Sequence, residues 1–124
     1  MKRVLVIERD GLLRELIGEW LAEAGAEALW PESPAAARAD IDAILVEVTC
    51  QQQAHAILTS WRRSYPGAPI VLASGRFSAG DTANDAMASR LGVTRILAKP
   101  FTRDDLWAAL NLPGRPATTG PQPR

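Results

Sequence analysis

Residues 4–10 read Val-Leu-Val-Ile-Glu-Arg-Asp, a short run of apolar residues that ends abruptly in three charged ones. A continuous apolar run of this length predicts a strand buried on both faces, as the strands of parallel sheets are. After Gly11 the spacing changes, and large apolar residues recur every three or four positions from Leu13 to Leu21. This spacing predicts a helix with one face against the core. The stretch therefore predicts a strand, a polar turn and a helix in succession.

The same unit recurs along the rest of the chain. Further strands are expected at residues 27–30, 43–48, 69–73 and 95–98, and further helical segments at residues 34–39, 54–61, 81–91 and 101–110. Strands that alternate with helices indicate βαβ units, and hence a parallel sheet covered by helices on both faces. The predicted fold class is therefore α/β with a doubly wound parallel sheet.

The length of 124 residues suits one domain. The periodic pattern stops after residue 111, and four of the nine prolines lie beyond it. We therefore expect one ordered domain over residues 1–111, followed by a disordered tail or the stub of a linker over residues 112–124.

The overall charge excludes some partners. The 14 basic residues balance the 14 acidic ones, which argues against a nucleic-acid-binding protein. The single cysteine, Cys50, and the single histidine, His55, suggest neither a disulfide nor a zinc site. No apolar run is long enough for a signal peptide or a membrane span. We therefore expect a cytoplasmic protein that does not bind membranes.

Polar residues follow almost every predicted strand. In parallel α/β sheets, sites form at the carboxyl ends of the strands. Only two of the basic residues are lysines, and one of them lies at such an end. The residues that follow the predicted strands are Glu8, Arg9, Asp10, Glu47, Ser74, Gly75, Lys99 and Pro100.

In this arrangement the chain resembles the receiver domains of bacterial two-component response regulators. The resemblance spans residues 3–111 and rests on four motifs in register, of which Lys-Pro-Phe is the most specific. The motifs are residues 4–10 with Leu-Leu-Arg at 12–14, Asp-Ala-Ile-Leu-Val-Glu-Val at 42–48, residues 69–75, and Lys-Pro-Phe at 99–101. The resemblance implies a flavodoxin-like (βα)5 fold with strand order 2-1-3-4-5, and a cis peptide bond before Pro100.

The resemblance also assigns positions to residues. In ordinary receivers an acid pair holds Mg²⁺, an aspartate accepts a phosphoryl group, and a hydroxyl and a lysine sense it. Glu8 and Arg9 stand at the acid-pair positions, and Glu47 stands at the acceptor position. Ser74 and Lys99 stand at the sensing positions. Asp10, which follows the acid pair, either belongs to this acidic pocket or caps the first helix.

The chain departs from the family at the positions that bind the metal ion and accept the phosphoryl group. Arg9 offers only hydrogen-bond donors, whereas Mg²⁺ needs oxygen ligands. The extra methylene of Glu47 moves its carboxylate by about 1.5 Å, and a displacement on that scale can cost on the order of 100-fold in rate. Ile96 stands where many receivers carry an aromatic switch residue. We therefore expect a degenerate receiver, or pseudo-receiver, with weak or absent Mg²⁺ binding and no other cofactor, in which Arg9 pairs with Glu47 and Lys99 is a second cation.

The expected function is signalling without enzymatic activity. Its partner would be a signalling protein, a histidine kinase or a second copy of the chain, bound through the last two helices and the last strand. Trp107 on the last helix is either an anchor on that surface or a packing residue. Two alternatives stay open. One is a working phosphoacceptor that holds its metal through Glu8 and Asp10; the other is a small flavodoxin-like ligand-binding domain.

Overall fold

The computed structural model describes residues 2–34, 40–49, 51–75 and 83–113. Five parallel strands form one sheet in the order β2-β1-β3-β4-β5, which confirms the predicted fold class. The strands are β1 (Arg3–Ile7), β2 (Glu27–Leu29), β3 (Ala43–Glu47), β4 (Ile70–Ser74) and β5 (Arg95–Ala98).

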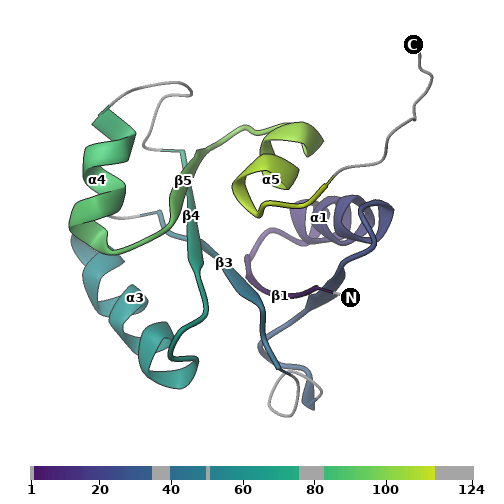
Figure 1. Cartoon of the computed structure of the whole chain (residues 1–124), viewed down its shortest axis with the longest axis horizontal. Coiled ribbons are helices and arrows are strands. Elements are labelled where there is room, and N and C mark those ends of the chain that lie inside the picture. The colour runs from purple at the N-terminus through teal and green to yellow at the C-terminus, as the bar shows by residue number, and fades with distance from the viewer. Residues whose placement is uncertain (1, 35–39, 50, 76–82, 114–124) are drawn as a thin grey trace.

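Helices cover both faces of this sheet. They are α1 (Gly11–Glu23), α3 (Gln51–Ser64), α4 (Ala83–Leu91) and α5 (Arg103–Ala109). Figure 1 shows α1 and α5 on one side of the sheet and α3 and α4 on the other. The helix expected at residues 34–39 and the start of the helix expected at residues 81–91 lie mostly outside the described residues.

Two cores result, one on each face of the sheet. Successive side chains of a strand point to opposite faces, so Val4 and Val6 enter the core under α1 and α5, whereas Leu5 enters the core under α3 and α4. All three are fully buried. The apolar run that opens the chain is therefore shared between two cores, which is why it lacks the alternation of a strand with one wet face.

The first helix is held at both ends by local chemistry. The Asp10 side chain accepts hydrogen bonds from the first turn, and Gly25, at φ 77°, follows the last turn in the left-handed conformation that glycine adopts readily. Ile17 and Leu21 are buried as the spacing predicts. Leu16, on the same predicted stripe, is 37% exposed and lines the pocket described below.

The chain stays buried beyond the end of the last helix. A capping box joins Thr102 and Asp105 at its start. Beyond its end, Leu112 is 9% exposed, packs into the core under α1 and α5, and donates its backbone N–H to the Trp107 carbonyl at 2.8 Å. Leu112 therefore belongs to the folded domain, although we expected the domain to stop at residue 111.

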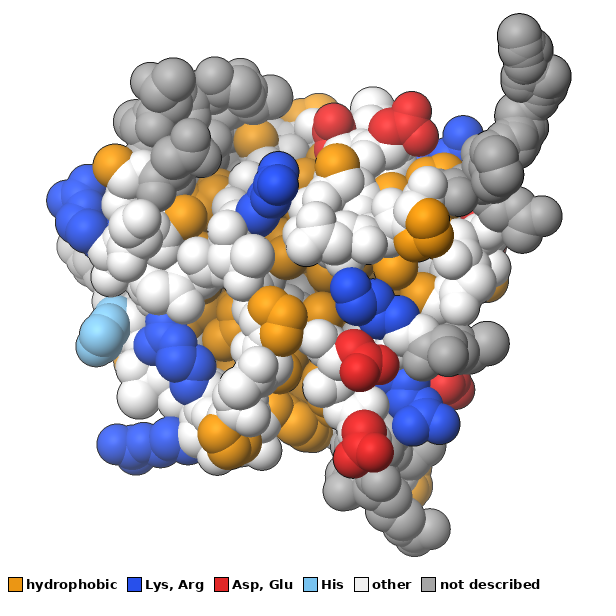
Figure 2. All heavy atoms as spheres, viewed as in Figure 1, with side chains coloured by type: hydrophobic (Ala, Val, Ile, Leu, Met, Phe, Trp, Pro, Cys, Tyr) orange, Lys and Arg blue, Asp and Glu red, His pale blue; other side chains and the backbone are white. Residues whose placement is uncertain are grey.

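Part of the surface charge lies in mixed pairs. Basic and acidic side chains lie close together on the right-hand part of the face in Figure 2, and ion pairs join Arg3 to Glu27 at 3.5 Å and Arg103 to Glu23 at 2.7 Å. Among the described residues, no helix has the length and apolar character needed to cross a membrane.

Candidate functional site

The carboxyl ends of β1, β3, β4 and β5 meet at one edge of the sheet. Register places Glu47 beside Ala73 and Ser74 beside Ala98 on neighbouring strands. Glu8 follows β1 directly, and Lys99 follows β5 directly. The residues that the sequence predicts to form a site are thus brought to one place by the parallel topology.

Glu8 is the most deeply buried acid of this group, with a side chain that is 4% exposed. Its Oε2 accepts hydrogen bonds from the backbone N–H groups of Arg9 at 3.0 Å and Asp10 at 3.1 Å. Its Oε1 lies 3.3 Å from the Lys99 ammonium nitrogen Nζ. Both carboxylate oxygens are therefore engaged within the chain, as a buried charge requires.

Lys99 lies between two carboxylates. Its Nζ is 3.3 Å from Glu8 Oε1 and 3.9 Å from Glu47 Oε2, and its side chain is 24% exposed. The Glu47 side chain is 9% exposed. One ammonium thus bridges two acids, and the name lysine bridge is used below for Glu8, Glu47 and Lys99.

The pKa of Glu47 is raised above its usual value, chiefly because burial disfavours the charged carboxylate. The Lys99 ammonium and, to a smaller extent, the Arg9 guanidinium act in the opposite direction, while the nearby Glu8 carboxylate adds to the rise. Burial therefore outweighs the attraction of the two cations for the charged form of Glu47.

The predicted pairing of Arg9 with Glu47 is wrong. Arg9 is exposed, and no ion pair joins it to Glu47 among the described residues. The turn after β1 gives the inward position to Glu8, so its neighbour Arg9 lies at the surface. Lys99, expected as the second cation, is the one that contacts both acids.

Asp10 caps the first helix. Its Oδ1 accepts hydrogen bonds from the backbone N–H groups of Leu12 at 3.0 Å and Leu13 at 3.3 Å. The cap is one of the two roles that the sequence left open for this residue. The Asp10 side chain is exposed and lies beside the lysine bridge without being part of it.

The remaining residues of the predicted site lie on β4, on β5 and directly after β5. Ser74 is 2% exposed, and its backbone carbonyl accepts the Lys99 N–H at 3.0 Å. The Lys99–Pro100 peptide bond is cis, as the resemblance implies. Ile96 is partly buried against the core under α3 and α4.

Trp107 is a packing residue and not an exposed anchor. It is 6% exposed within the core under α1 and α5, and its indole N–H donates to the Trp20 carbonyl at 2.8 Å. The Arg103 guanidinium lies 4.6 Å from its ring centroid and covers it from solvent. Of the two roles that the sequence leaves open for Trp107, its burial agrees with packing and not with an exposed anchor.

The acids at this edge do not fit a magnesium ion held as in the receiver family. Both oxygens of Glu8 are engaged within the chain, Arg9 supplies no oxygen, and one of the two Asp10 carboxylate oxygens accepts the helix-cap hydrogen bonds. In the part of the chain that the structure describes, no group of three or more His, Cys, Asp or Glu side chains is placed to hold a metal.

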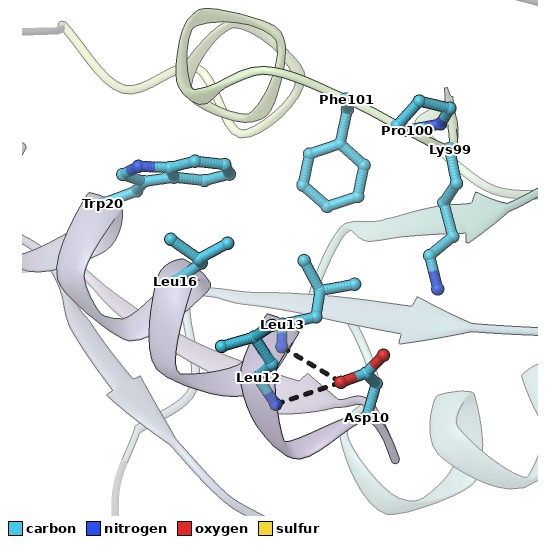
Figure 3. A pocket seen from close by; sticks show the side chains of 8 residues that line it. All are labelled: Asp10, Leu12, Leu13, Leu16, Trp20, Lys99, Pro100 and Phe101. Carbon is cyan, nitrogen blue, oxygen red and sulfur yellow. Dashed lines mark hydrogen bonds between the residues drawn. The ribbon is translucent and has the colours of Figure 1, made fainter.

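A pocket that the sequence does not predict lies next to the lysine bridge. It has a volume of about 460 Å³ and lies between α1 and the segment that joins β5 to α5 (Figure 3). Leu12, which forms part of its wall, is 70% exposed. The sequence signal was Leu12 itself, a large apolar residue outside the stripe that enters the core. The lining residues are Asp10, Leu12, Leu13, Leu16, Trp20, Lys99, Pro100 and Phe101.

The fold is shared with solved receiver domains. A response regulator receiver domain from Clostridium thermocellum has a TM-score of 0.68 and 24% identity, covering 90% of this chain and 92% of that one. The chemotaxis protein CheY4 of Vibrio cholerae has a TM-score of 0.66 and 21% identity over 90% of this chain and 97% of that one.

A third similar structure is the receiver domain of the sensor histidine kinase PA1611 from Pseudomonas aeruginosa PAO1, with a magnesium ion coordinated in its active-site cleft. It has a TM-score of 0.66 and 22% identity, covering 89% of this chain and 94% of that one. No protein-family model and no curated protein sequence matches the chain. On strand order, helix placement and these likenesses together, the chain has the fold of response regulator receiver domains.

Proposed function

We propose that this chain is a receiver-type module of two-component signalling that works through protein contacts and is not phosphorylated in the usual way. The observation that carries the proposal is the lysine bridge, in which the Lys99 ammonium is already engaged by the Glu8 and Glu47 carboxylates. In an ordinary receiver, by the resemblance, the lysine would meet a phosphoryl group and the acids a metal ion.

The chemistry of phosphoryl transfer explains why this arrangement opposes it. A carboxylate that attacks an anionic phosphoryl group needs its charge repulsion cancelled, usually by a metal ion and a nearby cation. Here the cation is bound to two carboxylates, and one acid-pair position holds Arg9. Glu47, at the acceptor position, is longer than aspartate and is held toward Lys99. We therefore propose that internal charges hold the site in one state, with Mg²⁺ binding weak or absent.

The proposed activity is recognition of a protein partner, such as a histidine kinase or another signalling protein in the cytoplasm, or of a second copy of the chain. The similar structures include chains described as response regulators and as parts of sensor histidine kinases. The partner surface through the last two helices and the last strand stays a prediction, with Trp107 removed from it because that side chain is buried.

The test is direct phosphorylation. The chain is incubated with acetyl phosphate and Mg²⁺, and its intact mass is measured; in parallel, amide spectra are recorded with Mg²⁺ and beryllium fluoride. We expect no phosphoryl adduct and no shifts at Glu47, Ser74 or Lys99.

The matched control restores the family's residues. In the double variant Arg9→Asp with Glu47→Asp, a carboxylate replaces the guanidinium at position 9 and the acceptor carboxylate retreats by about 1.5 Å. A gain of Mg²⁺-dependent shifts in this variant, with none in the unmodified chain, supports the proposal. A stable phosphoryl adduct on Glu47 of the unmodified chain would instead establish the working phosphoacceptor, which is the second reading of the sequence.

A further inference from the structure

We propose that copies of this chain associate head to tail, with the acidic outer face of α1 on one copy set against a basic surface over α3 and α4 on the next. The inference rests on the proposed function in one respect, since it names a second copy as the protein partner. It differs from the surface that the resemblance implies, because two different faces of the chain meet and one of them belongs to α1.

Charge is separated along the chain, although the total is zero. Residues 1–50 contain ten acidic and five basic residues, whereas residues 51–99 contain two acidic and six basic residues. The first part supplies β1, α1, β2 and β3, and the second supplies α3, β4, α4 and β5. In Figure 2 the described side chains on the left, over α3 and α4, include basic ones and a histidine, and the visible acidic side chains lie on the right. The neutral chain is therefore an electric dipole.

The basic surface forms at the ends of α3 and α4. α3 has no acidic residue, and Arg62 and Arg63 lie in its last turn. Arg90 lies in the last turn of α4, and Arg95 begins β5. The Arg62 guanidinium donates a hydrogen bond to the Leu91 carbonyl, so the ends of the two helices are joined. The four arginines are called the arginine face below.

The cations of the arginine face have no acidic partners within the described residues. Arg63, Arg90 and Arg95 are exposed. An anionic surface that meets them would gain electrostatic attraction without breaking an ion pair that the described chain already makes. The basic residues that do form ion pairs in the described chain are Arg3, Arg14, Lys99 and Arg103.

The outer face of α1 carries the complementary charge. Glu15 and Glu19 are four residues apart, so they lie one turn apart on the same side of the helix. Both are exposed, and neither joins an ion pair with a described residue. Like charges at this spacing destabilise a helix, so cations held against these two carboxylates would stabilise α1. Glu15 and Glu19 are called the acidic face below.

Exposed apolar area accompanies the charges on both surfaces. Leu12 is 70% exposed and Leu16 is 37% exposed, and both lie on α1 beside the acidic face. On the other surface, the partly buried Trp61 and Tyr65 stack with their ring centroids 6.3 Å apart, next to the arginines of α3. Contact between these apolar groups would remove them from water and supply affinity, whereas the opposite charges would set the orientation.

A second copy fits both surfaces because one chain provides the two of them. α1 lies on one side of the sheet and α3 and α4 on the other, so the two faces cannot meet within a single chain (Figure 1). Zero net charge leaves no overall repulsion between copies. A contact between two different surfaces is heterologous, and it leaves one surface of each kind free at the ends of the assembly. We therefore expect growth beyond the dimer at high concentration.

The test is sedimentation velocity of the full chain over a range of concentrations and at two ionic strengths. At about 20 mM NaCl exposed charges act over long distances, whereas at about 0.5 M NaCl the screening length falls to roughly 4 Å. We expect concentration-dependent association with a Kd of the order of 0.1 mM at low salt. The association should become about tenfold weaker at high salt, because exposed charge pairs are screened.

Two double variants remove one surface each. Glu15→Gln with Glu19→Gln neutralises the acidic face, and Arg63→Gln with Arg90→Gln neutralises most of the arginine face. All four side chains are exposed, and each variant alone should be monomeric. An equal mixture of the two should form a dimer, because one variant still offers its arginine face and the other its acidic face. Growth should stop at the dimer, and recovery in the mixture also shows that both variants are folded.

The matched control separates position from net charge. Asp40→Asn with Asp104→Asn changes the net charge by the same amount as the two glutamate substitutions, from exposed positions outside both faces. This variant should associate as the unmodified chain does. Loss of association in the control would show that net charge, and not the acidic face, controls the contact, and would overturn the proposal.

The proposal is also wrong if the unmodified chain stays monomeric at low salt, or if the mixture of double variants does not associate. A dimer that persists in both double variants and at high salt would indicate the surface of the last two helices and the last strand instead. A monomeric chain that binds polyglutamate through the arginine face would show that the partner is a different acidic protein. These outcomes overturn only the present inference, since the proposed function is overturned by a phosphoryl adduct in the acetyl phosphate experiment.

Discussion

The three side chains of the lysine bridge do not balance in charge. When all three groups of the lysine bridge are ionised, two carboxylates share one ammonium. Glu8 also accepts two backbone N–H groups, whereas Glu47 depends on the more distant contact to Lys99. Glu47 is therefore the group that should take up a proton first, in keeping with its raised pKa.

The raised pKa of Glu47 predicts a pH dependence of stability. A carboxyl group with a higher pKa in the folded state than in the unfolded chain binds protons more tightly when folded. Its contribution to the free energy of unfolding is fully present below the ordinary glutamate pKa of 4.5 and is lost as the pH rises through the raised pKa of the folded state. Glu47→Gln, which stays neutral, should flatten this decline in urea unfolding measured from pH 4 to pH 8. An unchanged slope in the variant would contradict the prediction.

Lys99 should be the more important of the two lysines for stability. Lys99→Met leaves the buried Glu8 and Glu47 carboxylates without their ammonium partner, which should cost about 1–3 kcal/mol at neutral pH. Lys2→Met is the matched control, because within the described residues Lys2 donates a hydrogen bond to the Leu110 carbonyl at 2.7 Å and contacts no carboxylate. This substitution should cost about 1 kcal/mol or less. Urea unfolding of both variants checks the order; a larger loss for Lys2→Met would show that the lysine bridge contributes little.

The helices show which local sequence signals determine where a helix begins. The sequence predicts a helix from the Leu13–Leu21 spacing, but the helix begins at Gly11 because Asp10 caps the turn before the apolar stripe starts. In α5 the reciprocal bonds of Thr102 and Asp105 fix the start at Arg103. Capping residues therefore place helix boundaries, whereas apolar spacing only indicates that a helix exists.

The capping box of α5 gives a prediction with an internal control. Thr102→Ala removes the hydroxyl that accepts the Asp105 N–H at 3.1 Å, and the expected loss is about 1 kcal/mol in the free energy of unfolding. Thr59→Ala removes a hydroxyl that donates to the His55 carbonyl within α3, and alanine there should leave stability unchanged or raise it slightly. Thermal unfolding compares the two; equal losses would show that the cap has no special role.

Over the whole molecule, the sequence predicts the sheet and the gathering of site residues well, because continuous apolar runs ending in charged residues are a direct consequence of parallel topology. It does not predict which cation contacts Glu47, since that depends on the turn after β1 sending Glu8 inward and Arg9 outward. It also misses the pocket, because exposure of Leu12 and Leu16 depends on how α1 packs against the segment around Phe101.

The C-terminal boundary of the folded domain depends on packing between distant parts of the chain. We predicted an end at residue 111, yet Leu112 is buried against α1 and α5 and its N–H is bonded to the Trp107 carbonyl. A chain that ends after Pro113 keeps both contacts, so we expect it to unfold at the same temperature as the complete chain. A chain that ends after Asn111 loses one buried leucine and one backbone hydrogen bond, at a cost of about 2 kcal/mol.

The variant Leu112→Ser in the chain ending after Pro113 separates the side chain from the backbone bond. It removes the buried apolar group and keeps the N–H, so most of the loss seen on truncation to Asn111 should already occur in this variant, because burial of a leucine outweighs one backbone hydrogen bond in net free energy. Calorimetric unfolding of the three shortened chains and the complete chain measures this. If the chain ending after Asn111 unfolded at the same temperature as the complete one, the core would end at Leu110, and the domain boundary would be the one that apolar periodicity alone indicates.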